Sequence, residues 1–198
     1  MIDMITIAQK GPHKTTTPEQ RADPILKRLP PGPATMVEIG VFVGTLSRYL
    51  LSRHHDLSMI LVDNWAPMEM QPLAYRETED RHAKQTLEEC VEYRIKAKRN
   101  VREFKDRFRF LVMPSVEAAA HVADHSVDLV FIDGDHSEEG ARADIEAWQA
   151  KPKRGGYLAG HDFSPSFPGV ERAVSDWVGR RSERILELDT DHTWFCRC

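Results

Sequence analysis

This chain of 198 residues lacks the sequence features of membrane, secreted and disulfide-rich proteins. No apolar run comes near the roughly 20 residues that a membrane-spanning helix requires. The N-terminus lacks the basic, apolar and small-residue segments of a signal peptide. Cysteine is scarce: Cys196 and Cys198 are too close for an ordinary disulfide or a zinc knuckle, and Cys90 is left over. We therefore expect a cytoplasmic protein with free thiols and no membrane contact.

An excess of one charge is missing as well. The formal net charge is -4, so the sequence carries no basic footprint for nucleic acid. A local basic cluster from Arg94 to Arg109 is interpreted as a solvated helix face. With 41% hydrophobic and 29% charged residues, the composition is that of an ordinary globular protein. The length fits a single domain over residues 1–198, and we expect its partner to be a small molecule.

The dinucleotide-binding fingerprint GxGxxG is absent from the glycine turn between the first predicted strand and helix. This turn, Glu38 to Gly44, contains Gly40 and Gly44, but Phe42 stands where a second glycine would admit a pyrophosphate. The pattern favours a nucleotide-type cofactor with a charged amino-acid end and no phosphate, and a turn without a ligand is the alternative. Asp63, which closes the next predicted strand, could accept both ribose hydroxyls of such a cofactor.

Strand-length and helix-length patterns alternate along the chain, which predicts an α/β fold with a parallel sheet and ligands at the carboxyl ends of its strands. A charged segment at about 65–105, with a helical section from about 79 to 104, interrupts this rhythm. It is either a lid-like insertion or a solvent-facing helical pair. Expected strands cover 36–41, 58–63, 108–113, 127–133 and 156–161, and expected helices cover 18–28, 45–54, 115–122, 137–151 and 169–179. Two last short strands, 185–188 and 193–196, flank a turn at Asp189-Thr190-Asp191, so one of them should be antiparallel.

Ionisable residues gather after the fourth and fifth of these strands. Asp133, Asp135 and His136 follow one, and His161 and Asp162 follow the other. Adjacent parallel strands lie about 4.8 Å apart, so Asp133, His161 and Asp162 can converge on one divalent cation such as Mg²⁺ or Mn²⁺. A bound cation would lower the pKa of a substrate hydroxyl, and His136 could accept the proton. Helix capping is the structural alternative for one or two of these residues.

The segments 127–136, 143–148 and 155–162 together resemble the class I S-adenosylmethionine-dependent methyltransferases, specifically the small metal-dependent O-methyltransferases of sugars and natural products. The resemblance extends from about residue 37 to 195. It implies a Rossmann-like three-layer sandwich with a mostly parallel seven-stranded sheet in the order 3-2-1-4-5-7-6, in which strand seven is antiparallel.

The same resemblance assigns roles to individual residues. Glu38 and Gly40 would line the methionine end of the cofactor beside Gly44, Asp63 would hold the ribose, and Ser115 would approach the adenine. From the sequence alone, a helix cap is the stronger alternative for Ser115. Asp133 and Asp162 match the metal ligands of the family, and His136 matches a general base. Trp65, Tyr75 and Phe163 could shape an acceptor pocket or simply contribute to packing.

We therefore expect an enzyme that transfers a methyl group from S-adenosylmethionine to a hydroxyl of a small molecule, assisted by a divalent cation. Two alternatives remain at this stage. One is a metal-dependent hydrolase or lyase on the same fold, and the other is a non-catalytic S-adenosylmethionine-binding protein. A homo-oligomer is compatible with the sequence, but no heptad pattern predicts one.

Overall fold

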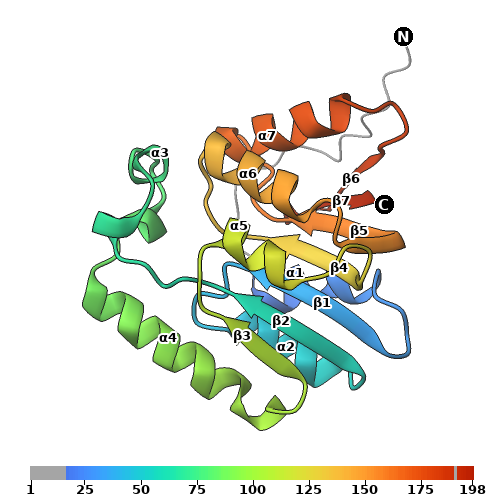
Figure 1. Cartoon of the computed structure of the whole chain (residues 1–198), viewed down its shortest axis with the longest axis horizontal. Helices are drawn as coiled ribbons and strands as arrows, with labels where there is room; N and C mark the ends of the chain where they lie inside the picture. The colour runs from blue at the N-terminus through green and yellow to red at the C-terminus, as the bar shows by residue number, and fades with distance from the viewer. Residues whose placement is uncertain (1–16, 190) are drawn as a thin grey trace.

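The computed structural model describes residues 17–189 and 191–198 of the chain. Its centre is one seven-stranded sheet in the order β3-β2-β1-β4-β5-β7-β6 (Figure 1). The pairs from β3 to β5 are parallel, whereas β7 runs antiparallel to both of its neighbours. The predicted fold class, strand order and antiparallel seventh strand are therefore confirmed. The strands are β1 Ala34–Ile39, β2 Leu57–Val62, β3 Phe108–Leu111, β4 Val127–Ile132, β5 Pro152–Gly160, β6 Leu186–Leu188 and β7 Trp194–Arg197.

Helices cover both faces of the sheet and make a three-layer sandwich (Figure 1). One layer packs α1, α2 and α4 together, and the other packs α5, α6 and α7 together. None of the helices in residues 17–189 and 191–198 has the length and apolar character needed to cross a lipid bilayer. The helices of the two layers are α1 Pro18–Leu26, α2 Thr45–Arg53, α4 Leu87–Val101, α5 Ser115–Ala118, α6 Glu138–Trp148 and α7 Pro168–Gly179.

The central strands supply apolar side chains to both layers, because successive residues of a strand point to opposite faces. Val37 and Ile39 of β1 belong to the core under α5–α7, whereas Met36 belongs to the core under α1, α2 and α4. A strand buried on both faces reads as a continuous apolar run, which is why these strands were recognisable. Glu38 breaks the run, and it is buried on the Met36 side.

The boundaries differ from expectation at a few places with identifiable causes. The expected helical section from 79 to 104 is divided, because Thr86 forms a capping box with Glu89 and starts α4 there. Gly44, with a φ of 71°, is the N-cap of α2 in place of the expected Thr45. The turn expected at Asp189-Thr190-Asp191 includes Thr190, which lies outside the described residues.

The segment from 65 to 105 leaves the sheet after β2 and returns to it at β3. It contains four short helices and one long one, with α3 standing away from the sheet and α4 packed against α2 (Figure 1). Its short elements are η1 Met68–Met70, α3 Leu73–Arg76, η2 Arg81–Lys84 and η3 Arg102–Phe104. The segment therefore has two parts, of which only the first reaches over the carboxyl ends of the strands.

Candidate active site

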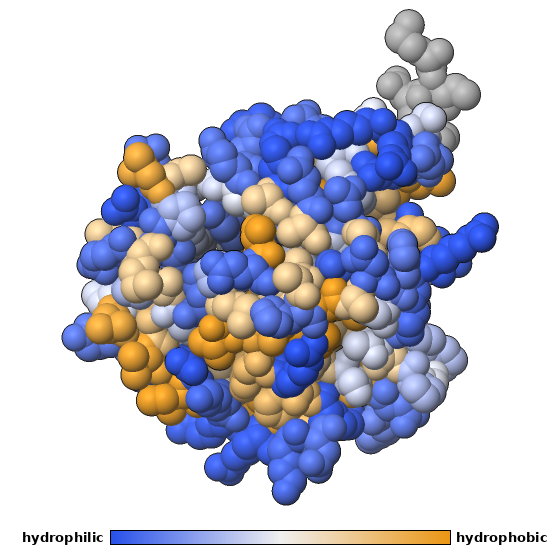
Figure 2. Space-filling view, in the orientation of Figure 1, coloured by the Kyte–Doolittle hydropathy of each residue, from blue (hydrophilic) through white to orange (hydrophobic). Residues whose placement is uncertain are grey.

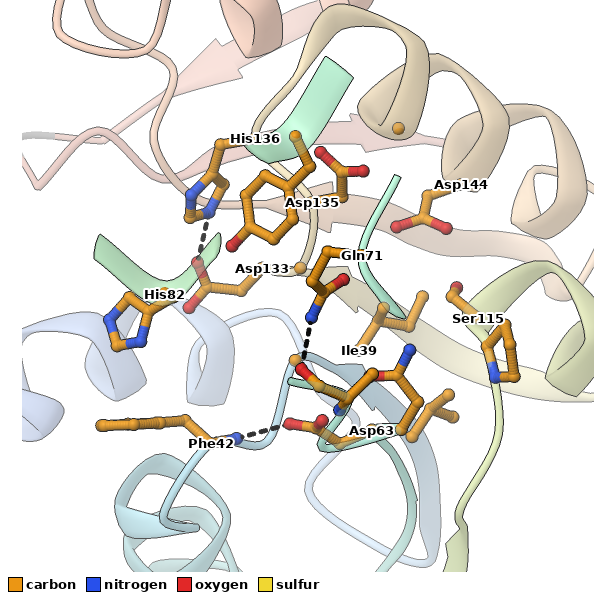
Figure 3. Close-up of a pocket in the computed structure, with 18 of the residues that line it drawn as sticks. Ile39, Phe42, Asp63, Gln71, His82, Ser115, Asp133, Asp135, His136 and Asp144 are labelled. Carbon is orange, nitrogen blue, oxygen red and sulfur yellow. Dashed lines mark hydrogen bonds and ion pairs between the residues drawn. The ribbon is translucent and has the colours of Figure 1, made fainter. Parts of the chain in front are cut away.

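A cavity of about 470 Å³ opens at the carboxyl ends of β1, β2, β4 and β5. Its volume lies within the range of small-molecule sites. The glycine turn, the loops after β3, β4 and β5, and residues 65–85 all contribute to its wall. Figure 3 shows Asp63, Ser115 and His136 at three separate edges of this space.

The glycine turn sits against the loop that follows β4. Gly40 has a φ of 83°, and a Cβ there would overlap the backbone carbonyl of Asp133. Only glycine fits this position, and it lines the cavity. Gly44 instead faces Ala97 of α4 and is not part of the cavity wall formed by the described residues. The two glycines thus have different tasks, one at the ligand space and one at a helix contact.

Asp63 follows β2 and lines the cavity beside the glycine turn. Its carboxylate accepts a hydrogen bond of 2.8 Å from the backbone N–H of Phe42 (Figure 3) and a second, also of 2.8 Å, from that of Trp65. Burial raises the pKa of Asp63 to about 6, and the backbone donors limit the rise. Phe42 and Trp65 both have positive φ values, of 52° and 44°. Non-glycine residues rarely adopt this conformation, and it occurs preferentially at functional sites.

Glu38 lies beneath the turn and does not reach the cavity wall. It is 2% exposed, and Ser47 of α2 donates a hydrogen bond of 2.6 Å to its carboxylate. Burial raises its pKa to about 8, so it is mostly protonated at neutral pH. The structure therefore brings Gly40 and Asp63 together at the cavity, while Glu38 contacts α2 below them.

Ser115 and Asp144 of α6 form the edge of the cavity opposite Asp63. Trp148 donates from its indole nitrogen to Ser115 Oγ at 2.8 Å. Asp144 is 5% exposed, and burial raises its pKa to about 7 although Ser115 partly offsets the effect. Both residues line the cavity (Figure 3). A neutral carboxyl group at this position can donate as well as accept a hydrogen bond.

A compact group of ligating atoms forms the other end of the cavity. One ligand atom each from Asp133, His136 and Asp162 lies within 4.8 Å of the other two. His136 Nε2 is 3.1 Å from Asp162 Oδ2 and 3.6 Å from Asp133 Oδ1. Asp162 has a φ of 61°, a left-handed backbone conformation that turns its side chain into the group.

Asp80, from the segment after α3, contacts Nδ1 of His136, the ring nitrogen on the other side from Asp133 and Asp162. Its carboxylate is 2.6 Å from His136 Nδ1 and also accepts a hydrogen bond from the Tyr75 hydroxyl at 2.7 Å. Burial alone would lower the pKa of His136, but its contacts with the carboxylates of Asp133, Asp80 and Asp162 raise it to about 10. Despite burial, the contacts of Asp80 with His136, with the backbone N–H of His82 and with the Tyr75 hydroxyl lower its pKa to about 2. Three carboxylates therefore surround the imidazole of His136 and favour its protonated form.

Arg21 of α1 supplies a second positive charge. Its guanidinium donates to Asp133 Oδ2 at 2.6 Å, across 112 positions of the sequence. Burial opposes ionisation of Asp133, yet Arg21 and the two histidines hold the pKa of that carboxyl well below its usual range. Because Arg21 uses Oδ2, the other oxygen of Asp133 remains directed toward His136.

His161 and Asp135 lie at the edge of this group. His161 Nδ1 is 3.0 Å from Asp162 Oδ1 and 4.0 Å from Asp133 Oδ1, and its Nε2 is 3.9 Å from Asp191 Oδ2. The compact group thus contains His136 where the sequence suggested His161. Asp135 accepts from the backbone N–H of Ser137 at the start of α6.

The donor set fits a divalent cation. Two carboxylates and one imidazole nitrogen match the preferences of Mg²⁺ or Mn²⁺. His136 Nε2 is buried and makes no hydrogen bond of suitable geometry in the described part of the chain, although carboxylate oxygens of Asp162 and Asp133 lie 3.1 and 3.6 Å from it. Metal-binding histidines usually give their second ring nitrogen to a carboxylate, which is the relation between His136 Nδ1 and Asp80.

Aromatic rings enclose the space in front of this group. Of the three candidates from the sequence, Trp65 and Tyr75 line the cavity, whereas Phe163 packs against the core under α5–α7. Phe42 and Phe167 line it as well; the Phe167 ring centre lies 4.7 Å from that of His136. Rings at these positions can exclude water from a bound molecule.

Sequence reasoning missed Arg21, Asp80 and Asp144 as members of the site. Asp144 carried a readable signal, because it lies on the apolar face of α6 with Ala141, Ile145 and Trp148. Arg21 and Asp80 carried no such signal in the sequence. Their contacts with Asp133 and His136 arise only when α1 and the segment after α3 fold over the sheet.

Comparison with known proteins agrees with this geometry. Residues 37–163 match the sequence model of a family described as a methyltransferase domain. No curated protein matches the sequence at a significant level. Among solved structures, the O-methyltransferase NovP has a TM-score of 0.63 at 18% identity, covering 91% of this chain and 76% of its own. CalS11, a calicheamicin methyltransferase, has a TM-score of 0.64 at 15% identity, covering 89% and 77%. A methyltransferase from Geobacter sulfurreducens has 0.58 at 16% identity, covering 92% and 80%.

Proposed function

The chain belongs to the methyltransferase domain family, and from this premise we propose that it transfers the methyl group of S-adenosylmethionine to a hydroxyl of a small molecule with the help of a divalent cation. One observation carries the proposal. A single cavity joins the glycine turn and Asp63 at one end to Asp133, His136 and Asp162 at the other. A methyl donor and a cation-bound acceptor can therefore meet inside it.

The glycine turn and Asp63 form the end of the cavity that would hold the methyl donor, here called the donor end, and the role of each residue there follows from its position and chemistry. Gly40 allows the cofactor to approach the backbone, and Asp63 offers its carboxylate to the ribose hydroxyls. Ser115 and Asp144 face the place where the adenine would lie. Both offer hydrogen-bonding oxygen atoms, and Asp144 can remain protonated near neutral pH. Glu38 acts indirectly in this proposal, by holding the turn through Ser47.

At the acceptor end, Asp133, His136 and Asp162 would hold the cation. When bound, it would polarise the acceptor hydroxyl and lower its pKa. The sulfonium of the donor is already activated, so the protein chiefly has to align the acceptor and exclude water. Phe42, Tyr75 and Phe167 would do the latter, while Asp80 holds His136 in position.

His136 has two possible tasks, and they differ in a measurable way. As a ligand, it gives Nε2 to the cation, which the orphaned Nε2 and the Asp80 contact favour. As the general base suggested by the sequence, it would leave cation affinity to the two aspartates. We assign it as a ligand and expect His136→Gln to weaken Mn²⁺ binding at least roughly tenfold in calorimetric titration. Unchanged Mn²⁺ affinity with a loss of kcat would assign it as the base instead.

The proposed activity is tested by binding and turnover together. We expect S-adenosylhomocysteine to raise the melting temperature of the protein and NAD to leave it unchanged. Methyl transfer to a panel of small hydroxylated molecules should require Mg²⁺ or Mn²⁺ and stop with EDTA. No shift at saturating S-adenosylhomocysteine would overturn the proposal. Turnover that needs the cation and no methyl donor would favour the hydrolase or lyase.

A further inference from the structure

Helix α4 presents apolar side chains on two separate faces, one buried and one exposed. Cys90, Ala97 and Val101 point inward and are at most 1% exposed. Leu87, Val91 and Ile95 recur at four-residue intervals and therefore form one stripe along the helix. They are 59%, 51% and 60% exposed, and the space-filling view shows apolar surface over this helix (Figure 2). Contiguous exposed apolar surface of this kind marks interaction sites.

The charged residues of α4 are separated along its length. The N-terminal half carries acidic residues and the C-terminal half carries basic ones. Within residues 17–189 and 191–198, Glu88, Lys98 and Arg99 have no ion-pair partner, whereas Glu92 pairs with Lys96 at 3.2 Å. The acidic residues are Glu88, Glu89 and Glu92, and the basic ones are Arg94, Lys96, Lys98 and Arg99.

We infer that the exposed stripe of α4 is the interface of a homodimer, in which the α4 helices of two copies pack antiparallel across a twofold axis. A twofold interface uses the same patch on both subunits, so the patch has to be complementary to itself. An antiparallel pair meets this requirement here, because the acidic half of each helix lies beside the basic half of the other. The apolar stripes then face each other at the centre.

The same charges disfavour other occupants of this face. An anionic lipid surface or a nucleic acid would attract the basic half and be repelled by the glutamates of the acidic half. A second copy of the chain satisfies both halves at once. Lys98 and Arg99, which belong to the basic cluster that the sequence suggested to be a solvated face, gain a partner in this arrangement.

The dimer would also support the donor end of the cavity without forming part of it. Asn100 of α4 donates a hydrogen bond of 2.8 Å to the backbone carbonyl of Val43, and Ala97 packs against Gly44. The inward face of α4 thus holds the glycine turn while its outward face meets the partner. The inference does not depend on the methyl-transfer proposal, because association can be measured without cofactor, cation or acceptor.

The first test is the mass of the protein in solution over a wide range of concentration, by light scattering after gel filtration. We expect a dimer, twice the mass of one chain. Val91→Lys should raise the dimer dissociation constant at least roughly tenfold. Ile185→Lys is the matched control, because Ile185 is 56% exposed and lies outside α4. A monomer at every concentration, or equal effects of both variants, would overturn the inference.

The second test reverses the charges of exposed side chains, so the variants should remain folded. Glu88→Lys alone and the double variant Lys98→Glu with Arg99→Glu should each be monomeric, since like charges then face each other. Mixed in equal amounts, they should form a heterodimer, because both contacts across the twofold axis become attractive again. A mixture that stays monomeric would overturn the antiparallel pairing. Binding of monomeric wild type to phosphatidylserine vesicles, lost in Val91→Lys, would assign the face to a membrane instead.

Discussion

The two ends of the cavity are built in different ways. At the donor end, Gly40 and Asp63 stand directly after neighbouring strands, and backbone N–H groups hold the Asp63 carboxylate. At the cation end, side chains from distant segments converge: Arg21 reaches Asp133, and Asp80 reaches His136 across 56 positions. The first end is a property of the strand–turn–helix unit, while the second exists only after the tertiary fold has formed. The two should therefore fail independently when residues are changed.

The largest effect is expected at Gly40, where both ends meet. Gly40→Ala places a methyl group against the carbonyl of Asp133 and strains a backbone with a φ of 83°. We expect the free energy of unfolding to fall by about 3 kcal/mol or more in urea denaturation. The control is Gly179→Ala, which has open space around it and should change stability little. Equal stability of the two variants would contradict the close approach of the turn to β4.

One substitution should weaken binding at the cation end of the cavity and leave binding at the donor end unchanged. Asp162→Asn keeps a residue type that tolerates the left-handed conformation, so folding should be retained. It removes a charged ligand, and we expect Mn²⁺ affinity to fall roughly 100-fold while S-adenosylhomocysteine affinity stays the same. Asp135→Asn, outside the compact group, is the matched control and should bind Mn²⁺ like the wild type. A parallel loss of both ligands in Asp162→Asn would show that the ends are not independent.

The donor end should give the reverse pattern. Asp63→Asn removes a carboxylate oxygen that can accept from a ribose hydroxyl, and we expect S-adenosylhomocysteine affinity to fall about tenfold or more in titration calorimetry. Mn²⁺ affinity should not change. Asp56→Asn, at an exposed position before β2, serves as the control and should leave both affinities unaltered. If Asp63→Asn binds S-adenosylhomocysteine as tightly as the wild type, Asp63 does not hold the ribose.

The last effect concerns Asp144 and, unlike the others, depends on pH. Its pKa in the folded protein is about 7, compared with about 3.9 for an unperturbed aspartate. Between these values the folded protein holds a proton that the unfolded chain releases, so stability falls as pH rises from about 4 to 7 and levels off above. Asparagine cannot ionise. Asp144→Asn should therefore gain stability relative to the wild type across this window, by at most about 4 kcal/mol. Ligand-free thermal unfolding at several pH values checks this, and a constant difference would refute it.

The sequence predicted the fold well because strands buried on both faces are legible as apolar runs. The strand β1, with Val37 and Ile39 toward one core and Met36 toward the other, is an example. Local chemistry also set some boundaries that pattern reading missed, such as the capping box of Thr86 that divides the segment before β3. Periodicity alone cannot show such a division, because the residues on both sides have helical propensity.

The site was predictable only where it follows strand ends. Gly40, Asp63, Asp133 and Asp162 could be placed by counting along strands, because the carboxyl ends of parallel strands share one edge. The choice between His136 and His161 could not be made that way. Both follow those ends, and only the position of Asp80 and the left-handed turn at Asp162 direct His136 into the compact group.

The central claim is that a methyl donor and a divalent cation occupy one cavity. The most direct measurement is the nuclear relaxation of S-adenosylmethionine carrying a ¹³C-labelled methyl group, bound to the protein with Mn²⁺ or with Mg²⁺. Paramagnetic Mn²⁺ should strongly accelerate relaxation of the methyl carbon in the wild type and fail to do so in Asp162→Asn. Equal relaxation with Mn²⁺ and Mg²⁺ in wild-type protein that holds both ligands would contradict the account.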